Sequence, residues 1–279
     1  MTTIDLPQGT ISYRAAGPAE SSTPPVVLVH GLLVSSTLWT GVQDALAGEG
    51  VRSFAPDLPL GAHRIPLRPD ADISPRGVAR MLLDLLAALD LTDVTLVGND
   101  TGGALCQFLI DTDPSRIGRL VLTNCDAFDQ FPPAPFGMLV RACRHPALIR
   151  AMMPTMRPTA MRHSAFGFGP LARRLDADVT RGWVEPLSTS REIRDDTARF
   201  TRGMHKSELL DVSTRLDRFG KPVRVVWGTA DRFFKVSLAR RLCAAFPNAT
   251  LVEVDGGRTF LSVDQPQRVA DEIRAAQAA

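Results

Sequence analysis

Asp100 lies in the segment G-N-D-T-G-G at positions 98–103, directly after an apolar run at 94–97. Apolar residues at helical spacing over 104–109 predict that a strand turns sharply into a helix here. Such a turn pushes its central side chain out of the sheet and aims the first free N–H groups of the helix at it. The flanking glycines are needed because a Cβ there would collide with the neighbouring backbone. The position suits a nucleophilic or basic carboxylate, and an aspartate that caps the helix is the simpler alternative.

Other side chains suited to chemistry are scattered along the chain. The four cysteines, Cys106, Cys125, Cys143 and Cys243, lie far apart without a C-x-x-C spacing. This spacing argues against a zinc site and against a disulfide framework. The segment 98–103 also lacks the Gly-x-Gly-x-x-Gly spacing of a dinucleotide site. We therefore expect neither a metal nor a cofactor.

The elements that must position Asp100 follow a strand–helix alternation. Residues 26–29 form a continuous apolar run of the kind found in buried parallel strands, and further strands are expected at 51–55, 94–97, 117–122, 222–228 and 250–254. One of the intervening helices is expected to begin with Ser74 as its N-cap and Pro75 at its first position. Alternation at this spacing indicates parallel βαβ units, and hence an open α/β sheet with helices on both faces.

The pattern changes between residues 128 and 206. Prolines cluster near its start, and apolar helical stretches follow without a strand between them. The simplest account is a helical cap inserted over the carboxyl ends of the strands. We expect core segments at 1–127 and 207–279, separated by a cap at 128–206.

The order of these elements resembles the α/β-hydrolase superfamily, whose core has a mostly parallel central sheet with a cap after the sixth strand. The resemblance covers nearly the whole chain and is carried by four segments: His30-Gly31, Pro56-Asp57, the turn at 98–103 with aspartate in place of serine, and the segment 228–234. It implies that Asp100 is the catalytic nucleophile and that Asp231, on the loop after a late strand, is the acid of the triad. A plain turn residue is the alternative for Asp231.

The resemblance also implies an oxyanion hole. Its two backbone donors would be the N–H of Leu32, which follows His-Gly, and the N–H of Thr101, and two such donors lower a barrier by several kcal/mol. His30 would order its own turn. Asn124, which follows the strand at 117–122, is a further candidate for binding the substrate.

This sequence departs from the family at the catalytic base. Where the family has histidine after the last strand, this chain has Arg258, 27 positions after Asp231 (258 minus 231). An aspartate ester must be hydrolysed by a water that histidine deprotonates, and a guanidinium with a pKa above about 12 cannot take that proton. His63 and His205 are the candidate replacements, with surface or packing roles as the alternative.

Three aspartate-nucleophile subfamilies fit this chain poorly. Epoxide hydrolases use cap tyrosines, whereas the single tyrosine here is Tyr13. Haloalkane dehalogenases hold the halide with tryptophan after the nucleophile and commonly asparagine after His-Gly, where this chain has Thr101 and Leu32. Fluoroacetate-type dehalogenases carry arginines just after the nucleophile, and residues 101–104 contain none.

The cap offers one positive indication. Residues 132–175 contain seven arginines interleaved with five methionines and have no acidic residue. Basic groups beside adaptable apolar side chains would suit an apolar molecule that bears an anion. The alternative is a methionine-filled cap interior with a solvated basic exterior.

Two functions follow from these observations. We expect an enzyme, a dehalogenase-like or esterase-like hydrolase of a small apolar molecule, either neutral or anionic, in which Asp100 is nucleophile or general base. Asp231 and Arg258 would complete its atypical site. The alternative is a catalytically inactive protein of this fold that binds a ligand or partner, with Asp100 and Arg258 paired across the old site.

Charge and hydropathy limit the partners. The chain has 32 Lys and Arg against 30 Asp and Glu, a net charge of +2, so nothing in the total suggests nucleic acid. The first residues lack the basic start and apolar run of a secretory signal, and no apolar stretch approaches membrane-spanning length. We expect a cytoplasmic protein with a small-molecule substrate and no membrane partner, and we predict no oligomeric state.

Overall fold

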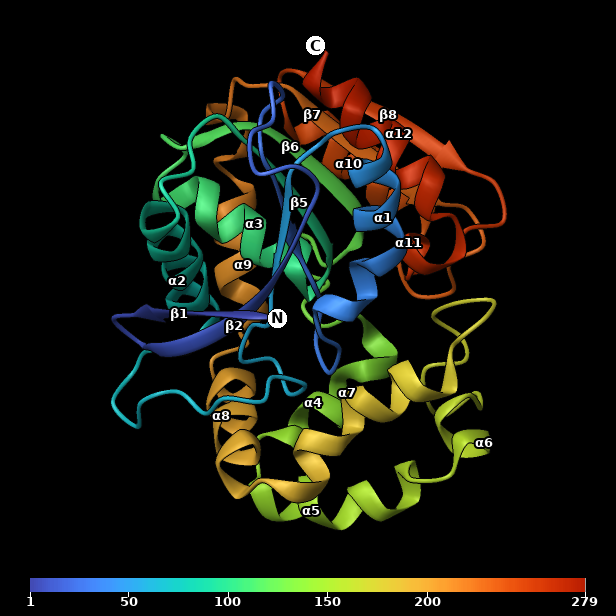
Figure 1. Ribbon diagram of the computed structural model, residues 1–279. Coiled ribbons are helices and arrows are strands. Elements are labelled where there is room, and N and C mark those ends of the chain that lie inside the picture. The colour runs from blue at the N-terminus through green and yellow to red at the C-terminus, as the bar shows by residue number, and fades with distance from the viewer. Residues whose placement is uncertain (279) are drawn as a thin grey trace.

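The computed structural model describes residues 1–278, which are built around one eight-stranded sheet (Figure 1). Its strands are β1 (Thr2–Leu6), β2 (Gly9–Ala16), β3 (Val26–Val29), β4 (Ser53–Pro56), β5 (Val94–Asp100), β6 (Ile117–Cys125), β7 (Val223–Gly228) and β8 (Ala249–Val254). They lie in the order β1-β2-β4-β3-β5-β6-β7-β8. The pairs β1–β2 and β2–β4 are antiparallel, and the others are parallel.

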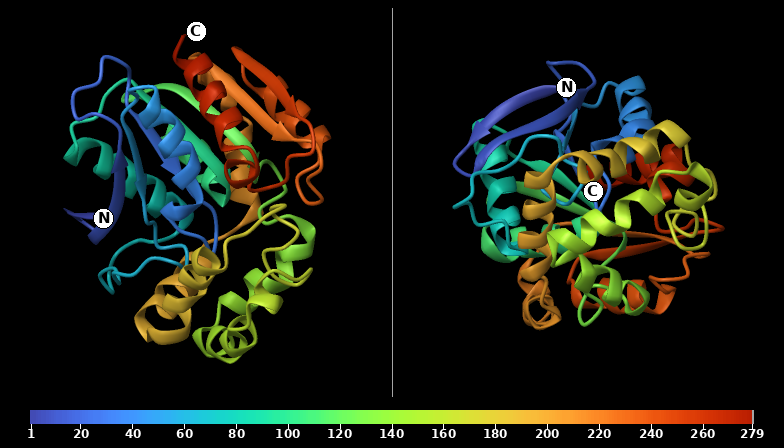
Figure 2. Two further views of the ribbon diagram at one scale, coloured as in Figure 1. Left: turned by 45° about the vertical axis from the view of Figure 1, so that its right-hand side comes forward. Right: turned by 90° about the horizontal axis from the view of Figure 1, so that it is seen from below.

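Helices cover both faces of this sheet (Figures 1 and 2). The core helices are α1 (Thr40–Gly48), α2 (Pro75–Ala88), α3 (Thr101–Thr112), α9 (Lys206–Ser213), α10 (Val236–Ala245), α11 (Leu261–Asp264) and α12 (Pro266–Gln277). Helices α1 and α12 pack together on one face, and α2, α3, α9 and α10 share the hydrophobic core of the other. The predicted fold class, an open and mostly parallel α/β sheet covered on both faces, is confirmed.

Local sequence signals explain where helix α2, which precedes β5, begins. Helix α2 begins as predicted, because the Ser74 hydroxyl accepts the N–H of Gly77 at 3.1 Å and Pro75 occupies the first turn. The N-terminal strand β1 was not predicted. Most of its residues are not buried, so its side chains show no apolar alternation, and only hydrogen bonds to β2 define it.

The segment 128–206, here called the cap, lies beyond the carboxyl ends of the parallel strands (Figures 1 and 2). The cap contains the helices α4 (Gly137–Cys143), α5 (Pro146–Met152), α6 (Thr159–Arg162), α7 (Ala177–Thr189) and α8 (Arg191–Arg202), and short 3-10 helices at Ala134–Phe136 and Met153–Met156. Two further 3-10 helices, Ser36–Trp39 and Leu216–Arg218, lie outside the cap. Trp183 ties α7 to the core, because its indole N–H donates to the Thr37 hydroxyl at 2.8 Å and its ring packs edge-on against Phe260. Across residues 1–278 no helix is both long enough and apolar enough to cross a membrane.

Candidate active site

Asp100 occupies the corner where β5 ends and α3 begins. Its backbone has φ 52° and ψ −131°, a positive φ that costs strain in a residue with a side chain. A Cβ added at Gly102 would lie 2.3 Å from the carbonyl oxygen of Val29, and one at Gly98 would lie 2.7 Å from the Cα of Gly103. Glycine is therefore required at these positions for strand and helix to approach each other this closely.

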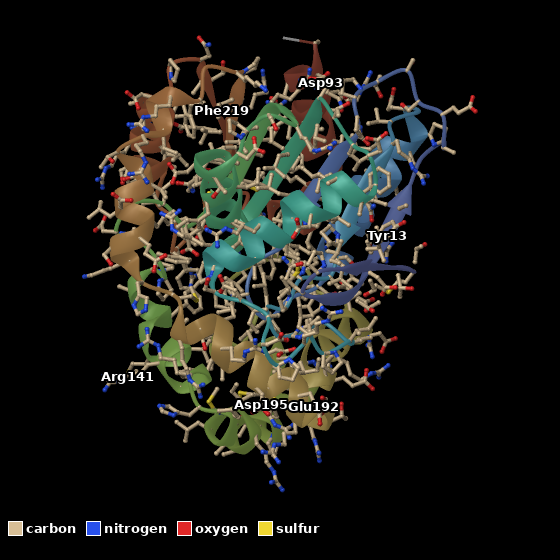
Figure 3. The ribbon with its side chains drawn as sticks, turned by 90° about the vertical axis from the view of Figure 1, so that its left-hand side faces the viewer. Tyr13, Asp93, Arg141, Glu192, Asp195 and Phe219 are labelled. Atoms are coloured by element: carbon tan, nitrogen blue, oxygen red, sulfur yellow. The ribbon has the colours of Figure 1, made fainter. Side chains whose placement is uncertain are left out.

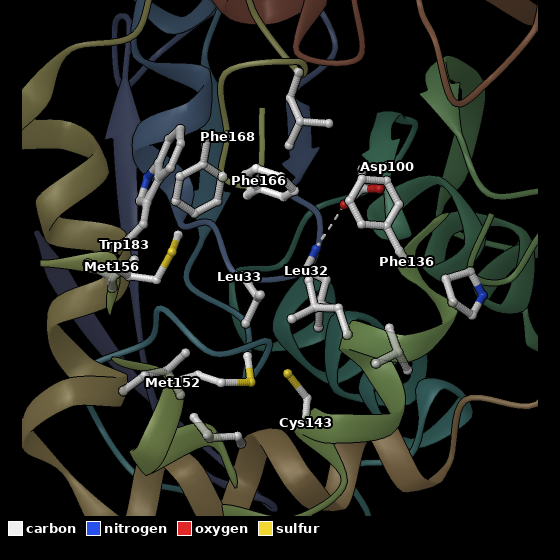
Figure 4. A pocket seen from close by; sticks show the side chains of 18 of the residues that line it. Leu32, Leu33, Asp100, Phe136, Cys143, Met152, Met156, Phe166, Phe168 and Trp183 are labelled. Atoms are coloured by element: carbon white, nitrogen blue, oxygen red, sulfur yellow. Dashed lines mark hydrogen bonds between the residues drawn. The ribbon is translucent and has the colours of Figure 1, made fainter. Parts of the chain in front are cut away.

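Backbone donors hold the Asp100 carboxylate. Its Oδ2 accepts the N–H of Leu32 at 3.1 Å (Figure 4), and the N–H of Thr101 also bonds the carboxylate. A Cβ on Gly31 would lie only 2.1 Å from Oδ2, so the His-Gly turn can reach this carboxylate only with glycine there. Among the described residues no side chain donates a hydrogen bond to Asp100, which leaves lone pairs of the carboxylate for a reacting group.

The surroundings of Asp100 raise the pKa of its carboxyl group toward neutral pH. Burial, the largest cause, raises the pKa of Asp100 to about 7, and the nearby Asp231 adds to the rise. The hydrogen bonds from the Thr101 and Leu32 backbones lower this pKa by less than burial raises it. At neutral pH the carboxyl is therefore divided between its protonated and ionised forms.

Asp231, on the loop after β7, is bound by four donors. Its Oδ1 accepts the backbone N–H groups of Phe233 at 2.7 Å and Phe234 at 3.1 Å. Its Oδ2 accepts the side-chain amide of Asn124 at 2.8 Å and the hydroxyl of Thr259 at 2.9 Å. Burial raises the pKa of Asp231, and these hydrogen bonds oppose the rise. Asn124 thus orients an acid of the site.

Arg258 points away from this cluster, and its expected role is corrected accordingly. Its guanidinium donates to the carbonyl oxygens of Gly169 at 3.2 Å and Ala172 at 3.1 Å, both in the cap. The next residue, Thr259, is the one whose side chain reaches Asp231. The side chains of Arg258 and Thr259 point in different directions because they are neighbours in the chain. Since the Arg258 guanidinium bonds carbonyl oxygens of the cap, it forms no pair with Asp100.

The histidines considered as replacement bases are engaged elsewhere. His63 Nε2 lies 3.3 Å from Asp196 Oδ2 of α8, in a buried contact, and His205 is exposed at the start of α9. Both ring nitrogens of His30 bond backbone groups, at 2.8 and 2.9 Å, so His30 orders its turn. Burial lowers the pKa of His30, which keeps the ring neutral. The described residues thus place no histidine in contact with Asp100.

Asp126, which directly follows β6, is a candidate that the sequence analysis missed. Its Oδ2 accepts the Thr101 hydroxyl at 3.0 Å, and its backbone N–H donates to the carbonyl of Asp100 at 3.2 Å. Its Oδ1 is buried without a hydrogen-bond partner. Burial and the charge of Asp100 raise the pKa of Asp126 well above its usual range. The sequence signal that could have identified it is an acidic residue at the carboxyl end of β6, the strand beside β5.

Asp100 and Asp126 both line a cavity of about 260 Å³ between core and cap. Figure 4 shows Asp100 in the wall of this cavity. Among the described lining residues these two aspartates are the only ones of a charged type, and no histidine, lysine or arginine is present. The remaining wall is mostly aliphatic, aromatic and sulfur-containing: Leu32, Leu33, Thr101, Pro132, Pro133, Phe136, Leu139, Val140, Cys143, Ile149, Met152, Met153, Thr155, Met156, Met161, Phe166, Gly167, Phe168, Leu171, Trp183, Val184 and Leu187. Across residues 1–278 no group of three or more His, Cys, Asp or Glu side chains is placed to hold a metal ion.

The cap arginines do not face this cavity, which corrects the expected anion site. Arg141 is exposed and projects away from the cap (Figure 3). Arg162 is buried, and its guanidinium donates to the carbonyl of Ala177 at 3.0 Å and to the hydroxyl of Thr180 at 3.2 Å. A buried guanidinium needs such acceptors, since its unpaired burial is costly. The cap therefore has a methionine-rich interior and a largely basic exterior.

Known proteins similar to this chain include enzymes of several activities. Residues 24–265 match the family model described as alpha/beta hydrolase fold. The chain is 27% identical over 251 residues to a 2-hydroxy-6-oxononadienedioate/2-hydroxy-6-oxononatrienedioate hydrolase of Paraburkholderia xenovorans (86% of this chain, 81% of that protein). It is 25% identical over 288 residues to a cis-3-alkyl-4-alkyloxetan-2-one decarboxylase of Xanthomonas campestris pv. campestris (98% and 94%). The crystal structure of a haloalkane dehalogenase from Bradyrhizobium elkani matches with a TM-score of 0.78 at 20% identity (99% and 98%).

Proposed function

Since the chain belongs to the alpha/beta hydrolase fold family, we propose that it is a hydrolase whose Asp100 attacks a carbon atom of a small, uncharged and mainly apolar substrate. The observation that supports this most directly is the 3.1 Å hydrogen bond from the Leu32 N–H to Asp100 Oδ2 beside an apolar cavity. One carboxylate oxygen is held while the other is available to attack. When water later attacks the ester carbon, the developing oxyanion meets the same backbone donors.

The cavity wall supports an uncharged substrate. The Paraburkholderia hydrolase is named for a dicarboxylate, whose two negative charges would be repelled by the ionised Asp100 and would meet no cation among the described residues of the wall. The Xanthomonas decarboxylase is named for an uncharged ring carrying two alkyl groups. A molecule of that polarity suits a wall of methionine, leucine and phenylalanine.

The hydrogen bond from Thr259 to Asp231 favours a second candidate, a non-catalytic binding protein. In a hydrolytic triad the acid accepts a hydrogen bond from an imidazole and orients it. Here Asp231 instead accepts one from the Thr259 hydroxyl, which cannot serve as a base at neutral pH. In this function the cavity binds an apolar ligand without covalent chemistry.

The proposal is tested by following oxygen-18 from labelled water during incubation with 1-bromoalkanes, terminal epoxides and short-chain esters. We expect a substrate-sized mass addition on Asp100 and, after several turnovers, oxygen-18 in the Asp100 carboxylate, because water attacks its ester carbon. Asp100→Asn should abolish both signals. Peptide mapping locates the added mass and the label.

The matched control is Asp90→Asn, since Asp90 also has a positive φ, 49°, but its side chain is 98% exposed. This variant should behave as wild type. Product formation without label in Asp100 would indicate a general base instead of a nucleophile. Ligand binding with neither product nor added mass would support the binding protein.

A further inference from the structure

Three aspartates at the ends of β5, β6 and β7 differ in their hydrogen-bond donors. Asp231 has four donors, Asp100 has two backbone N–H groups, and Asp126 has one hydroxyl. Each donor stabilises the ionised carboxylate, so the tendency to keep a proton increases from Asp231 to Asp126. Carboxyl groups whose surroundings separate their protonation in this way are suited to different roles in acid–base chemistry.

Asp126 lines the cavity and has a buried oxygen, Oδ1, without a hydrogen-bond partner. Among the described residues, the other buried side-chain atoms without a partner belong to residues outside the cavity wall. The Thr101 hydroxyl occupies Oδ2, so Oδ1 is the oxygen left to carry the proton of a neutral carboxyl. Burial and the adjacent Asp100 raise the pKa of Asp126, which favours the protonated form.

Apart from Asp126, Asp100 and Cys143, whose thiol has a pKa raised by burial to about 11, no described side chain in the wall is titratable. The wall has no histidine, tyrosine, lysine or arginine. The Thr101 hydroxyl already donates to Asp126, and the Trp183 indole N–H donates to Thr37.

We propose that Asp126 is a catalytic acid and base: it protonates the leaving group when Asp100 attacks, and then deprotonates the water that hydrolyses the ester. This inference rests on the proposed nucleophilic role of Asp100. Asp126 would thus supply two functions: that of the proton donor, for which the cap has no tyrosine, and that of the base, for which the loop after β8 has no histidine.

The steps balance for a substrate with a carbon–oxygen leaving group, such as a cyclic ether. A lone pair of the ionised Asp100 forms a bond to ring carbon, the ring carbon–oxygen bond breaks, and the released oxygen takes the proton of Asp126. The Asp126 carboxylate next takes a proton from water, whose oxygen bonds to the ester carbon of Asp100. The tetrahedral oxyanion collapses, and the departing alkoxide takes the proton back from Asp126. This leaves Asp100 as the carboxylic acid and Asp126 ionised, and transfer of the Asp100 proton to Asp126 restores the starting state. The net reaction is substrate plus water to diol.

This assignment makes a prediction about substrate class. An alkoxide is a poor leaving group without a proton, whereas bromide leaves without one. Proton donation by Asp126 therefore favours substrates whose leaving atom is oxygen.

The test compares 1,2-epoxyhexane with 1-bromohexane in single-turnover alkylation of Asp100, followed by intact-mass spectrometry. Asp126→Asn keeps the size of the side chain and an acceptor for the Thr101 hydroxyl but has no acidic proton. We expect alkylation by the epoxide to slow by about 10²-fold and alkylation by the bromide to change by less than about twofold. Wild-type protein in deuterated water supplies a second measurement, with a slower reaction expected for the epoxide alone.

Equal slowing with both probes would assign Asp126 a structural role and overturn the inference, as would an unchanged epoxide rate. If the bromide alkylates Asp100 and deuterated water has no effect on the epoxide reaction, the inference fails while the nucleophile stands. No alkylation of wild type by either probe would remove the nucleophile and, with it, the inference.

Discussion

At the scale of single residues, the raised pKa of Asp100 couples function to stability. In the unfolded chain this carboxyl titrates near 3.8, and in the folded protein burial raises its pKa to about 7. Between these values the folded state binds a proton that the unfolded state has lost, so stability decreases as the pH rises through this window and levels off above about 7. A buried carboxylate without a cationic partner is thus destabilising at the pH where it is reactive.

We therefore predict that Asp100→Asn stabilises the protein above pH 7 and has little effect near pH 4. The asparagine never ionises, and a pKa difference contributes about 1.4 kcal/mol per unit, so the gain at pH 8 should be on the order of a few kcal/mol. Urea unfolding of wild type and variant at pH 4, 6 and 8 measures this difference. Parallel stability profiles of the two proteins would contradict it.

At the scale of elements, the loop between β8 and α11 decides which side chain serves Asp231. Gly256 turns the chain with φ 68°, and the Asn99 side chain donates to the carbonyl of Thr259 at 2.7 Å. These contacts fix the register of the loop, so that Thr259 faces Asp231 and Arg258 faces the cap. Thr259 is therefore the residue of this loop whose side chain reaches Asp231.

A histidine introduced in this loop should act as a base only at position 259. We predict that Thr259→His shortens the lifetime of an alkyl ester on Asp100 by about 10²-fold, the usual contribution of a positioned base, whereas Arg258→His leaves it unchanged. The larger ring should also lower the free energy of unfolding by about 1–3 kcal/mol, because Thr259 is buried. Mass spectrometry after removal of excess 1-bromohexane measures the lifetime. A faster loss in Arg258→His than in Thr259→His would show that our register is wrong.

At the scale of the whole molecule, the cavity exists because the cap closes over the carboxyl ends of the strands. Two hydrophobic clusters form the interior, and the one that contains α1 and α12 continues into the cap through Trp183 and Phe168, whose ring centres are 5.1 Å apart. Core and cap are therefore packed as one unit around the cavity. Its 260 Å³ limits the length of an apolar substrate.

Filling the cavity from the cap should shorten the longest substrate accepted. Met153 is buried in the wall, and we predict that Met153→Trp reduces alkylation by long 1-bromoalkanes at least about tenfold relative to short ones, since overpacking a filled space costs about 1–3 kcal/mol. The matched control is Met138→Trp, because Met138 is 84% exposed and outside the wall. Alkylation rates over a series of chain lengths provide the measurement, and an identical length dependence in the two variants would contradict the assignment of the cavity.

The sequence by itself determined the strand–helix order, the start of α2 at Ser74 and the tight corner at Asp100. These features depend on signals within a few neighbouring residues: apolar periodicity, a capping hydroxyl and glycines. Only the tertiary structure decided that Thr259 rather than Arg258 bonds Asp231, that Asp126 lies beside Asp100, and that no cap arginine is among the described residues lining the cavity. The physical reason is that each of these contacts joins segments that only the packing of strands, loops and cap brings together, where the direction of one side chain depends on the acceptors offered by another segment.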